Sequence, residues 1–546
     1  MHQTFSIYQR IKPRILLVDN DPEARISYQS LLQEWGYMPV LAMGIGPSLQ
    51  DDARKKAQEQ RCCLALIDLR LHDDEDQEDM SGAEFAESMK RYLQPIILTG
   101  TDDPNTLRKL LQDHQNIPFI GKHDRRDEFR KRLDAEASKV SATKRNLEII
   151  QDEIMDDFMQ SELVFEMGEY TDQVANIIAR MFPNAQKIKF AELVTPDTEV
   201  SSATRPNSIV LRVFEDDMEA CVVKIARTIK IEKEASNFRE FISRKLTGGF
   251  TPQQIGKEVF SWDVGGIAYT YEGGKNAMTF ANYYREQDYE NIEKVLTAYF
   301  FETWDKYYTK PINECNTTLY KLFSRILGDD WFNKCKKEIS KPILNEAKAD
   351  LAKYNLPQPI DWLTKKITDG EGDFSPANML PSAIIHGDLH GDNLLVDNKN
   401  IVWVIDFERC GRGYAMQDFI QLETDILSRM LGHDVNESEY YEMCMLLLRQ
   451  PKIQVIEEID SIFKDEKIQK AVKTISSLRG FAAKCSQNTN IREYLMGLLF
   501  NMLFKAMLAH KEDPQKSKRP LIIAGFLCHR LDHWEDIWPP TEWKFQ

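Results

Sequence analysis

No stretch of the sequence is both long and apolar enough to cross a bilayer. The run LIIAGFLC at 521–528 is among the longest apolar runs, whereas a membrane-spanning helix needs about 20 such residues. The amino-terminal stretch MHQTFSIYQRIKPR likewise lacks the apolar core of a secretory signal. We therefore expect a cytoplasmic protein without a membrane partner.

The sequence also lacks an excess of positive charge. Its 70 Lys and Arg residues stand against 86 Asp and Glu, which gives a formal net charge of −16. Nucleic-acid-binding domains normally carry a basic patch, so this charge balance argues against a nucleic-acid partner.

Cysteine is sparse and without a recognisable spacing. The 9 cysteines are scattered and odd in number, and none forms a CxxC pair. We therefore expect reduced core residues and no disulfide framework or zinc site. With 546 residues and 42% hydrophobic content, the chain has the composition of an ordinary globular protein and room for two or three domains.

The most informative segment is AIIHGDLHGDNLLVDNKNIVWVIDFE at 383–408. Two apolar runs flank the turn-forming 397–400, which predicts a β-hairpin. Antiparallel pairing then brings Asn393 and Asp406 together. Converging polar side chains in a buried corner need a partner, and Mg²⁺ prefers such oxygen ligands. Asp388, in the preceding loop, remains to accept a proton from an attacking hydroxyl. The plainer interpretation is a hairpin with a polar rim.

The pattern HGDLHGDN…VIDFE resembles the aminoglycoside-phosphotransferase and choline-kinase-like branch of the protein-kinase-like superfamily. The resemblance implies a two-lobed fold with ATP in the cleft, with Asp388 as the catalytic base and Asn393 and Asp406 as Mg²⁺ ligands. Asp418 in GYAMQDFIQLE falls where that family places a buried aspartate that supports the catalytic loop. The two histidines of the motif, His386 and His390, would shape the loop.

Residues upstream supply the other parts that such a kinase needs. ACVVKIAR at 220–227 is a short apolar strand with one lysine, Lys224, which is expected to be half-buried and paired with a carboxylate. A helical segment follows, in which Glu234 matches the family's glutamate and Glu240 is the alternative. GIAYTYEGG at 266–274 resembles the adenine-binding linker, around Tyr271 and Glu272.

One stretch departs from the family pattern. The segment where a phosphate-covering hairpin is expected, 192–216, contains no glycine. Backbone amides approach phosphates closely where no Cβ intervenes, so this loop has less freedom to do so. The departure leaves open a pseudokinase that binds nucleotide without transferring phosphate.

The amino-terminal quarter has a different pattern. Apolar strands are predicted within RILLVDND, CCLALIDLRL, QPIILTGTDD and IPFIGKHD, with helical stretches between them. This alternation predicts a parallel sheet with helices on both faces. The polar residues follow the carboxyl ends of the strands, where functional sites of such sheets normally lie.

These motifs resemble a response-regulator receiver domain. The resemblance implies the following residues: Asp68 as phosphoacceptor, Asp19 with its neighbours Asn20 and Asp21 at Mg²⁺, Thr99 near the phosphoryl group, and Lys122 paired with it. An Asp-Asn pair replaces the usual adjacent acids. A cognate histidine kinase or another phosphorelay donor is the implied partner.

Between these regions, residues 125–180 contain almost no glycine or proline. Leu133, Val140, Leu147 and Ile154 recur every seven residues, which predicts a helix with a partial heptad stripe. Two interpretations remain open: a helix packed on its own domain, and a signalling helix that forms a homodimer or transmits the state of the receiver.

Together these patterns predict an α/β chain with a doubly wound parallel-sheet receiver domain and a two-lobed α+β kinase-like domain. The expected boundaries are a receiver at 12–135, a helical linker at 136–182, a kinase-like N-lobe at 183–274 and a helical C-lobe at 275–546. The leading hypothesis is a receiver-regulated, ATP- and Mg²⁺-dependent phosphotransferase acting on a hydroxyl of a protein or small molecule. The alternative is a non-catalytic scaffold that binds nucleotide and relays the receiver state to a protein.

Overall fold

The chain divides into two compact units in its computed structural model. The first comprises Met1–Leu193, Thr204–Lys233 and Gln253–Tyr271, and the second comprises the remaining segments. The structure describes residues 12–73, 75–101, 103–114, 116–150, 170–192, 208–246, 252–271, 277–368, 379–456, 462–509, 514–541 and 543.

The first unit begins with a parallel five-stranded sheet in the order β2-β1-β3-β4-β5. This is one of the two common doubly wound orders, in which ligands bind beyond the carboxyl ends of the strands. The sequence analysis missed β2. The strands are β1 (Arg14–Val18), β2 (Met38–Leu41), β3 (Leu64–Asp68), β4 (Gln94–Thr99) and β5 (Phe119–Gly121).

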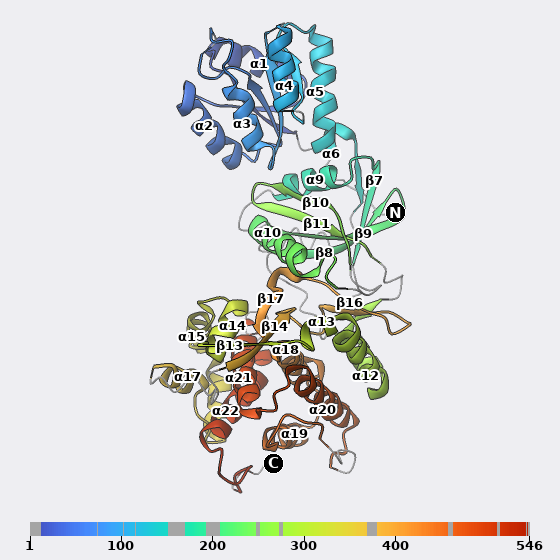
Figure 1. Cartoon of the computed structure of the whole chain (residues 1–546), viewed down its shortest axis with the longest axis vertical. Helices are drawn as coiled ribbons and strands as arrows, with labels where there is room; N and C mark the ends of the chain where they lie inside the picture. Colours follow the sequence, from blue (N-terminus) through green and yellow to red (C-terminus); the bar gives the residue numbers. More distant parts are fainter. Residues whose placement is uncertain are drawn as a thin grey trace. The chain divides into compact units, whose positions relative to one another are not determined.

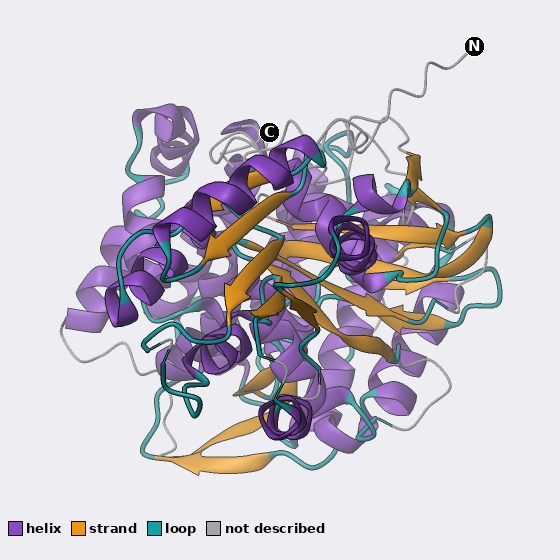
Figure 2. Cartoon of the chain, turned by 90° about the horizontal axis from the view of Figure 1, so that it is seen from above, coloured by secondary structure: helices purple, strands orange, loops and turns teal. Residues whose placement is uncertain are grey.

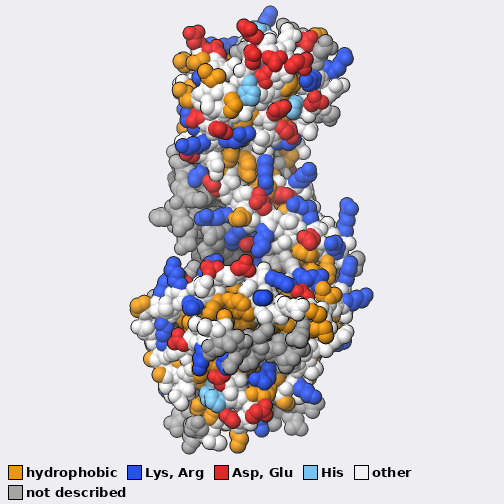
Figure 3. Space-filling view, turned by 60° about the vertical axis from the view of Figure 1, so that its left-hand side comes forward, with side chains coloured by type: hydrophobic (Ala, Val, Ile, Leu, Met, Phe, Trp, Pro, Cys, Tyr) orange, Lys and Arg blue, Asp and Glu red, His pale blue; other side chains and the backbone are white. Residues whose placement is uncertain are grey.

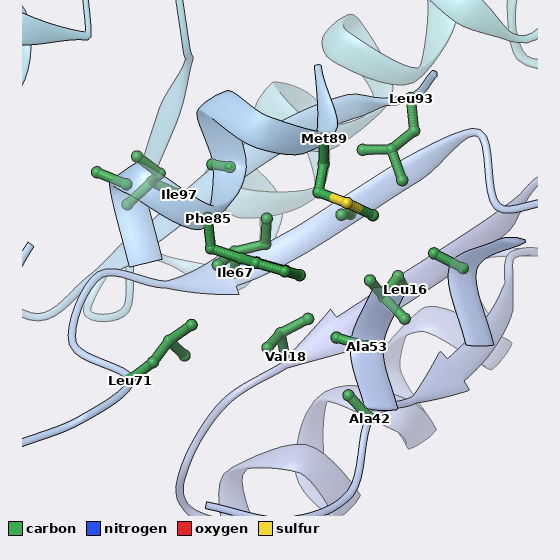
Figure 4. Packing of buried hydrophobic residues seen from close by; sticks show 14 of the residues in the cluster. Leu16, Val18, Ala42, Ala53, Ile67, Leu71, Phe85, Met89, Leu93 and Ile97 are labelled. Carbon is green, nitrogen blue, oxygen red and sulfur yellow. The ribbon is translucent and has the colours of Figure 1, made fainter. Parts of the chain in front are cut away.

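Helices cover both faces of this sheet (Figure 1). Alternate residues of each strand point to opposite faces, so the strands contribute to two separate cores. One core packs against α1 and α5, and the other against α2, α3 and α4; Figure 4 shows part of the second, where Phe85 and Met89 of α3 lie over Ile67 of β3. The helices are α1 (Pro22–Glu34), α2 (Gly46–Glu59), α3 (Ser81–Met89), α4 (Pro104–Asp113) and α5 (Arg126–Val140).

The same unit contains a second, six-stranded sheet in the order β10-β11-β9-β8-β7-β6. Apolar residues of α9 pack on it and form its core with the strands. Its strands are β6 (Glu148–Ile150), β7 (Lys187–Glu192), β8 (Ser208–Glu215), β9 (Met218–Arg227), β10 (Gln254–Ser261) and β11 (Val264–Tyr269). The helices around it are α6 (Ala142–Arg145), α9 (Tyr170–Met181) and α10 (Thr228–Asn237).

The expected continuous helix after residue 125 is wrong for residues 141–150. Helix α5 ends at Val140, and after the short α6 the chain turns at Asn146 in a left-handed conformation. Leu147 and Ile149 are then buried in the core of the second sheet, because β6 pairs with β7 as its edge strand. Ile154 lies outside the described residues, and the predicted domain boundaries remain predictions.

The second unit is mainly helical and holds two small sheets, β12-β15-β16 and β13-β14-β17. Helix α21 is buried on nearly all sides. The strands are β12 (Met278–Thr279), β13 (Ile312–Cys315), β14 (Met379–Ile385), β15 (Leu394–Val396), β16 (Val402–Val404) and β17 (Gly411–Tyr414). The longer helices are α12 (Tyr289–Ala298), α18 (Gln417–Asp425), α19 (Glu437–Arg449), α20 (Glu466–Ser486), α21 (Ile491–Ala509) and α22 (Lys518–Asp532); shorter ones are α11 (Phe280–Glu286), α13 (Asp305–Tyr308), α14 (Leu319–Leu327), α15 (Trp331–Ile339), α16 (Asn345–Lys353) and α17 (Pro359–Thr368).

Helices and strands both make up large parts of the chain (Figure 2), and the predicted α/β class with its parallel amino-terminal sheet is confirmed. Acidic and basic side chains are interspersed over the face shown in Figure 3. Within the part of the chain that the structure describes, no helix combines the length and hydropathy that crossing a membrane requires.

Candidate functional site

The first sheet brings three of the predicted receiver residues together at the carboxyl ends of its strands. Asp19 and Asp68, which follow β1 and end β3, are both buried. The ammonium group of Lys122, just after β5, lies 3.0 Å from the Oδ2 atom of Asp19 and 3.0 Å from the Oδ1 atom of Asp68. Thr99, at the end of β4, is also buried. These residues occupy the places that the sequence predicted.

The electrostatics of this cluster keep its lysine charged. Burial by itself lowers the pKa of Lys122, but the carboxylates of Asp68 and Asp19 outweigh that effect and raise the pKa above its ordinary value. A permanent cation between two buried carboxylates stabilises their negative charge. A phosphoryl group added to Asp68 would bring further negative charge beside the same ammonium group.

The residues next to Asp19 suit a divalent cation. The side-chain oxygen of Asn20 is buried and has no hydrogen-bond partner. A buried oxygen of this kind is normally satisfied by a bound cation or water. Asp21 is engaged elsewhere, because its carboxylate caps α1 by accepting the Glu23 amide at 2.9 Å. Asp19, Asn20 and Asp68 therefore fit Mg²⁺ better than Asp21 does.

The loop after Asp68 contains the acidic segment HDDEDQED at 72–79, and its last residue, Asp79, holds the loop in place. The carboxylate of Asp79 accepts the backbone amides of His72 and Asp73 at 3.0 Å each and that of Ser81 at 2.9 Å. Burial raises the pKa of Asp79, but these hydrogen bonds outweigh it and hold the pKa below its usual value. At least this member of the segment orders the loop.

Replacing Gly82 with alanine is expected to destabilise the receiver-like domain by about 1–3 kcal/mol, because the new atom has no space. A Cβ at this position would lie 1.8 Å from the carbonyl oxygen of Asp68. Gly100→Ala is the matched control, since its Cβ would meet nothing closer than 3.8 Å. Chemical denaturation of the full chain measures both, and equal unfolding free energies would contradict the expectation.

The predicted hairpin is present in the second unit. Strands β15 and β16 pair antiparallel, with Leu394 opposite Val404, and the amide of Ile405 donates to the carbonyl of Asn393 at 3.0 Å. Asn393 therefore lies opposite Ile405, the residue that precedes Asp406. Asp406 has φ 71° and ψ 77°, a left-handed conformation that is uncommon outside glycine and clusters at functional sites.

Asp388 and Asp406 are half-buried, whereas Asn393 is fully buried. The carbonyl of Asp388 accepts a hydrogen bond from the Nδ2 atom of the buried Asn393 at 2.7 Å. The carboxylate of Asp388 accepts Nη1 of Arg409 at 3.2 Å. The sequence analysis missed Arg409, whose position three residues after Asp406 was the available signal. The ion pair fixes the orientation of the carboxylate.

The backbone of the loop 386–393 is held by one face of helix α18. The carboxylate of Asp418 accepts the amides of His386 and Gly387 at 2.7 and 2.8 Å. Gln421 bonds both to the carbonyl of Gly387 and to the amide of Leu389, at 2.7 and 2.8 Å.

One turn further along α18, Asp425 accepts the amide of Gly391 at 2.9 Å. Its carboxylate is paired with Arg429 and Lys505; burial raises the pKa of Asp425, but these cations hold it well below the usual range. Asp418 was predicted. The other two polar side chains were missed, although polar residues at helical spacing in an otherwise apolar helix were a readable signal.

The buried Asp418 also accepts the hydroxyl of Tyr308. Burial raises the pKa of its carboxyl above the usual value, although the nearby His386 and the donated hydrogen bonds lower it. His386 is itself fully buried, and its Nε2 atom contacts the carbonyl of Ile405 at 3.0 Å. The roles of Asp418 and His386 in shaping the loop remain predictions.

The predicted nucleotide residues lie on separate elements. Lys224 of β9, opposite Ile267 of β11, is 2% exposed, and Glu234 of α10 is fully buried. Glu240 is exposed, which favours Glu234 over that alternative. The ion pair between Lys224 and Glu234 remains a prediction.

The adenine linker is described only at its start. The guanidinium of Arg212 lies over the ring of Tyr271 at 5.1 Å. Glu272 and 193–207, which include most of the glycine-free segment, lie outside the described residues. Over the described part of the chain, no group of three or more His, Cys, Asp and Glu residues could hold a metal, so each candidate Mg²⁺ site depends on an asparagine beside its carboxylates.

Three comparisons with known proteins bear on this arrangement. The family model of Ternary complex associated domain 9 matches residues 333–503, a range that includes the loop 386–393 and α18. No curated protein matches the chain. Among solved structures, a CheY-like receiver domain from Methanospirillum hungatei JF-1 shares 23% identity, with 23% of this chain and 97% of that chain covered and a TM-score of 0.19.

Two further structures are similar to parts of the chain. The chemotaxis protein CheY4 from Vibrio cholerae shares 20% identity, covering 23% of this chain and 98% of that one, with a TM-score of 0.19. Amicoumacin kinase hAmiN, in complex with AMP-PNP, Ca²⁺ and Ami, shares 12% identity over 63% of this chain and 91% of that one, with a TM-score of 0.35.

Proposed function

We propose that the protein is an ATP-dependent phosphotransferase whose activity is controlled by phosphorylation of Asp68. The observation that carries the catalytic part is the loop 386–393, whose backbone is fixed by three side chains of α18. Such a fixed loop places the Asp388 carboxylate and the Asn393 amide in defined positions, which is what positioning and electrostatic catalysis of phosphoryl transfer require. The protein would act in the cytoplasm.

In this proposal Asp388 is the general base. The hydroxyl oxygen of the acceptor forms a bond to the γ-phosphorus of ATP, the bond from that phosphorus to its bridging oxygen breaks, and ADP leaves. The hydroxyl proton passes to Asp388, whose carboxylate Arg409 orients. Asn393 and Asp406 would hold Mg²⁺, which neutralises phosphate charge when bound. Lys224, buried on β9, would contact the phosphates.

The receiver part of the proposal has a separate basis. Asp68 lies beside Lys122 and Asp19 at the edge of the sheet where ligands bind in doubly wound folds. A carboxylate nucleophile of this kind forms an aspartyl phosphate. The phosphoryl donor would be a histidine kinase or another phosphorelay protein, and the acceptor of the kinase-like domain a protein or small-molecule hydroxyl.

Transfer of label from Mg-ATP by the purified full-length chain tests the proposal. We expect label on the protein, or ATP turnover, that is lost in Asp406→Ala. We also expect this activity to change when acetyl phosphate is added and not to change in Asp68→Ala. An activity that is indifferent to acetyl phosphate would remove the regulatory part.

A non-catalytic scaffold is the second candidate, favoured by the absence of glycine in 192–216. It predicts binding of Mg-ATP, measured as a thermal shift, without turnover or transfer to any hydroxyl. Retention of Asp388, Asn393, Asp406 and Lys224 favours catalysis, because these are the residues that the chemistry uses.

A further inference from the structure

The amino-terminal edge of the first sheet contacts the second sheet of the same unit. Trp262, in the turn between β10 and β11, is 9% exposed and belongs to the core on the α2, α3 and α4 face of the first sheet. Its indole N–H donates to the carbonyl of Cys62 at 2.8 Å, and its ring stacks on Tyr92 with centroids 5.0 Å apart. A residue of the second sheet thus fills the core of the receiver-like domain.

Polar contacts surround this tryptophan. The guanidinium of Arg180 on α9 donates to the carbonyl of Phe260 at 2.6 Å, that of Arg91 at 3.3 Å and that of Tyr92 at 3.4 Å. Burial lowers the pKa of Arg180 to about 10, so it stays charged at neutral pH and binds one carbonyl of the second sheet and two of the first domain.

Two ion pairs join the same surfaces. Arg61 lies 3.4 Å from Asp263 in the β10–β11 turn, and Arg14 of β1 lies 2.8 Å from Asp172 of α9. Both pairs are partly buried, so salt screens them less than exposed pairs.

Trp262 contacts the residues that precede β3 and β4, the two strands whose opposite ends carry Asp68 and Thr99. Cys62 precedes β3, the strand that ends at Asp68, and Tyr92 precedes β4, the strand that ends at Thr99. At roughly 3.3 Å per residue, each strand joins Trp262 to a receiver-site residue about 20 Å away. Both residues that would respond to phosphorylation are therefore connected to Trp262 by a single buried strand.

The other side of Trp262 contacts the elements that carry the predicted nucleotide residues. The hydroxyl of Thr228, the first residue of α10, donates to the carbonyl of Trp262 at 2.6 Å, and its amide to the carbonyl of Asp263 at 2.9 Å. Arg91 forms an ion pair with Glu232, one turn further along α10. The same helix carries Glu234.

We propose that this contact, formed by Cys62, Arg91, Tyr92, Thr228 and Trp262 and called here the Trp262 joint, transmits the phosphorylation state of Asp68 to helix α10. The inference rests on the regulatory part of the proposed function and names its route. A shift of β3 or β4 moves the groups that hold Trp262, and through Thr228 and Glu232 it moves the start of α10. Coupling of this kind is reciprocal, so nucleotide bound near α10 also changes the affinity of the receiver site.

Amide hydrogen exchange of the full-length chain with Mg²⁺, with and without beryllofluoride as the phosphoryl mimic, tests the joint without requiring catalysis. In the wild type, we expect beryllofluoride to change the exchange of 228–237 by about fivefold, the lower end of typical allosteric couplings. The response should be lost in Arg91→Ala and reduced in Trp262→Phe, which keeps a stacked ring and loses the indole donor. Lys90→Ala is the matched control, because Lys90 pairs with Glu87 within α3.

Three results would overturn the inference. They are an unchanged response of 228–237 in both joint variants, no response of 228–237 in the wild type while the receiver loops respond, and no response anywhere. The experiment can still be interpreted if the protein transfers no phosphate, because amide exchange of 228–237 measures the response of α10 and not catalysis. A response that persists without any transfer activity therefore supports the joint and rejects catalysis.

Discussion

Replacing Asp388 with asparagine is expected to lower phosphoryl transfer from Mg-ATP by about 10²–10⁴-fold, the usual contribution of a general base. Asparagine has nearly the same shape and retains an oxygen that can accept the Arg409 hydrogen bond, but it cannot take the proton of the acceptor. Nucleotide affinity should stay unchanged. Single-turnover transfer of label and calorimetric binding of Mg-AMP-PNP measure the two effects separately.

Asp361→Asn is the control for this variant. Asp361 is an exposed residue of α17, so it removes the same charge without touching the catalytic loop. Wild-type transfer by Asp388→Asn would show that another group accepts the proton. Equal loss in both variants would attribute the effect to net charge.

Replacing Asp418 with alanine is expected to lower the free energy of unfolding by roughly 2–5 kcal/mol, because it leaves buried hydrogen-bond donors without a partner. The carboxylate accepts the amides of His386 and Gly387 and the hydroxyl of Tyr308. Gly387 cannot shift easily in compensation, since it has φ +80° and an added Cβ would lie 2.4 Å from the carbonyl oxygen of Arg409. Transfer activity should fall together with stability.

Gln421→Ala is the comparison variant for Asp418→Ala, because it removes other hydrogen bonds to the same loop without removing a buried carboxylate. Gln421 contacts the same loop through a neutral side chain, so its removal should cost less, about 1–3 kcal/mol. Chemical denaturation gives the unfolding free energies, and exchange of the amides at 386–391 localises the change. A larger effect of Gln421→Ala than of Asp418→Ala would contradict the role assigned to the aspartate.

The positions of Asp388 and Asp418 in and behind the loop 386–393 explain why Asp388→Asn should affect chemistry and Asp418→Ala should affect stability. Asp388 is partly exposed, so its replacement should act mainly on chemistry. Asp418 is fully buried behind the loop, so its replacement should act on stability first and on chemistry through position. The ratio of the two effects therefore distinguishes a group that reacts from a group that positions.

The amino-acid sequence by itself determined the elements whose signal is local. The strands β1, β3, β4 and β5 follow from short apolar runs, and the β15–β16 hairpin follows from two such runs around the turn 397–400. Asp19, Asp68, Thr99 and Lys122 could be placed because carboxyl ends of parallel strands share one edge. Asn393 and Asp406 could be paired because antiparallel strands bring their outer ends together.

Tertiary structure alone decided where elements distant in sequence meet. The heptad spacing through Leu147 predicted a continuing helix. The chain after it instead forms β6, which pairs with β7, and Leu147 is buried in the core of that sheet, because edge pairing and a shared core outweigh weak helical periodicity. Trp262 enters a core whose other residues lie between Leu16 and Ile117, and no local sequence pattern predicts such a contact. Local spacing determines which face of a segment is apolar, whereas only the packed chain determines what covers that face.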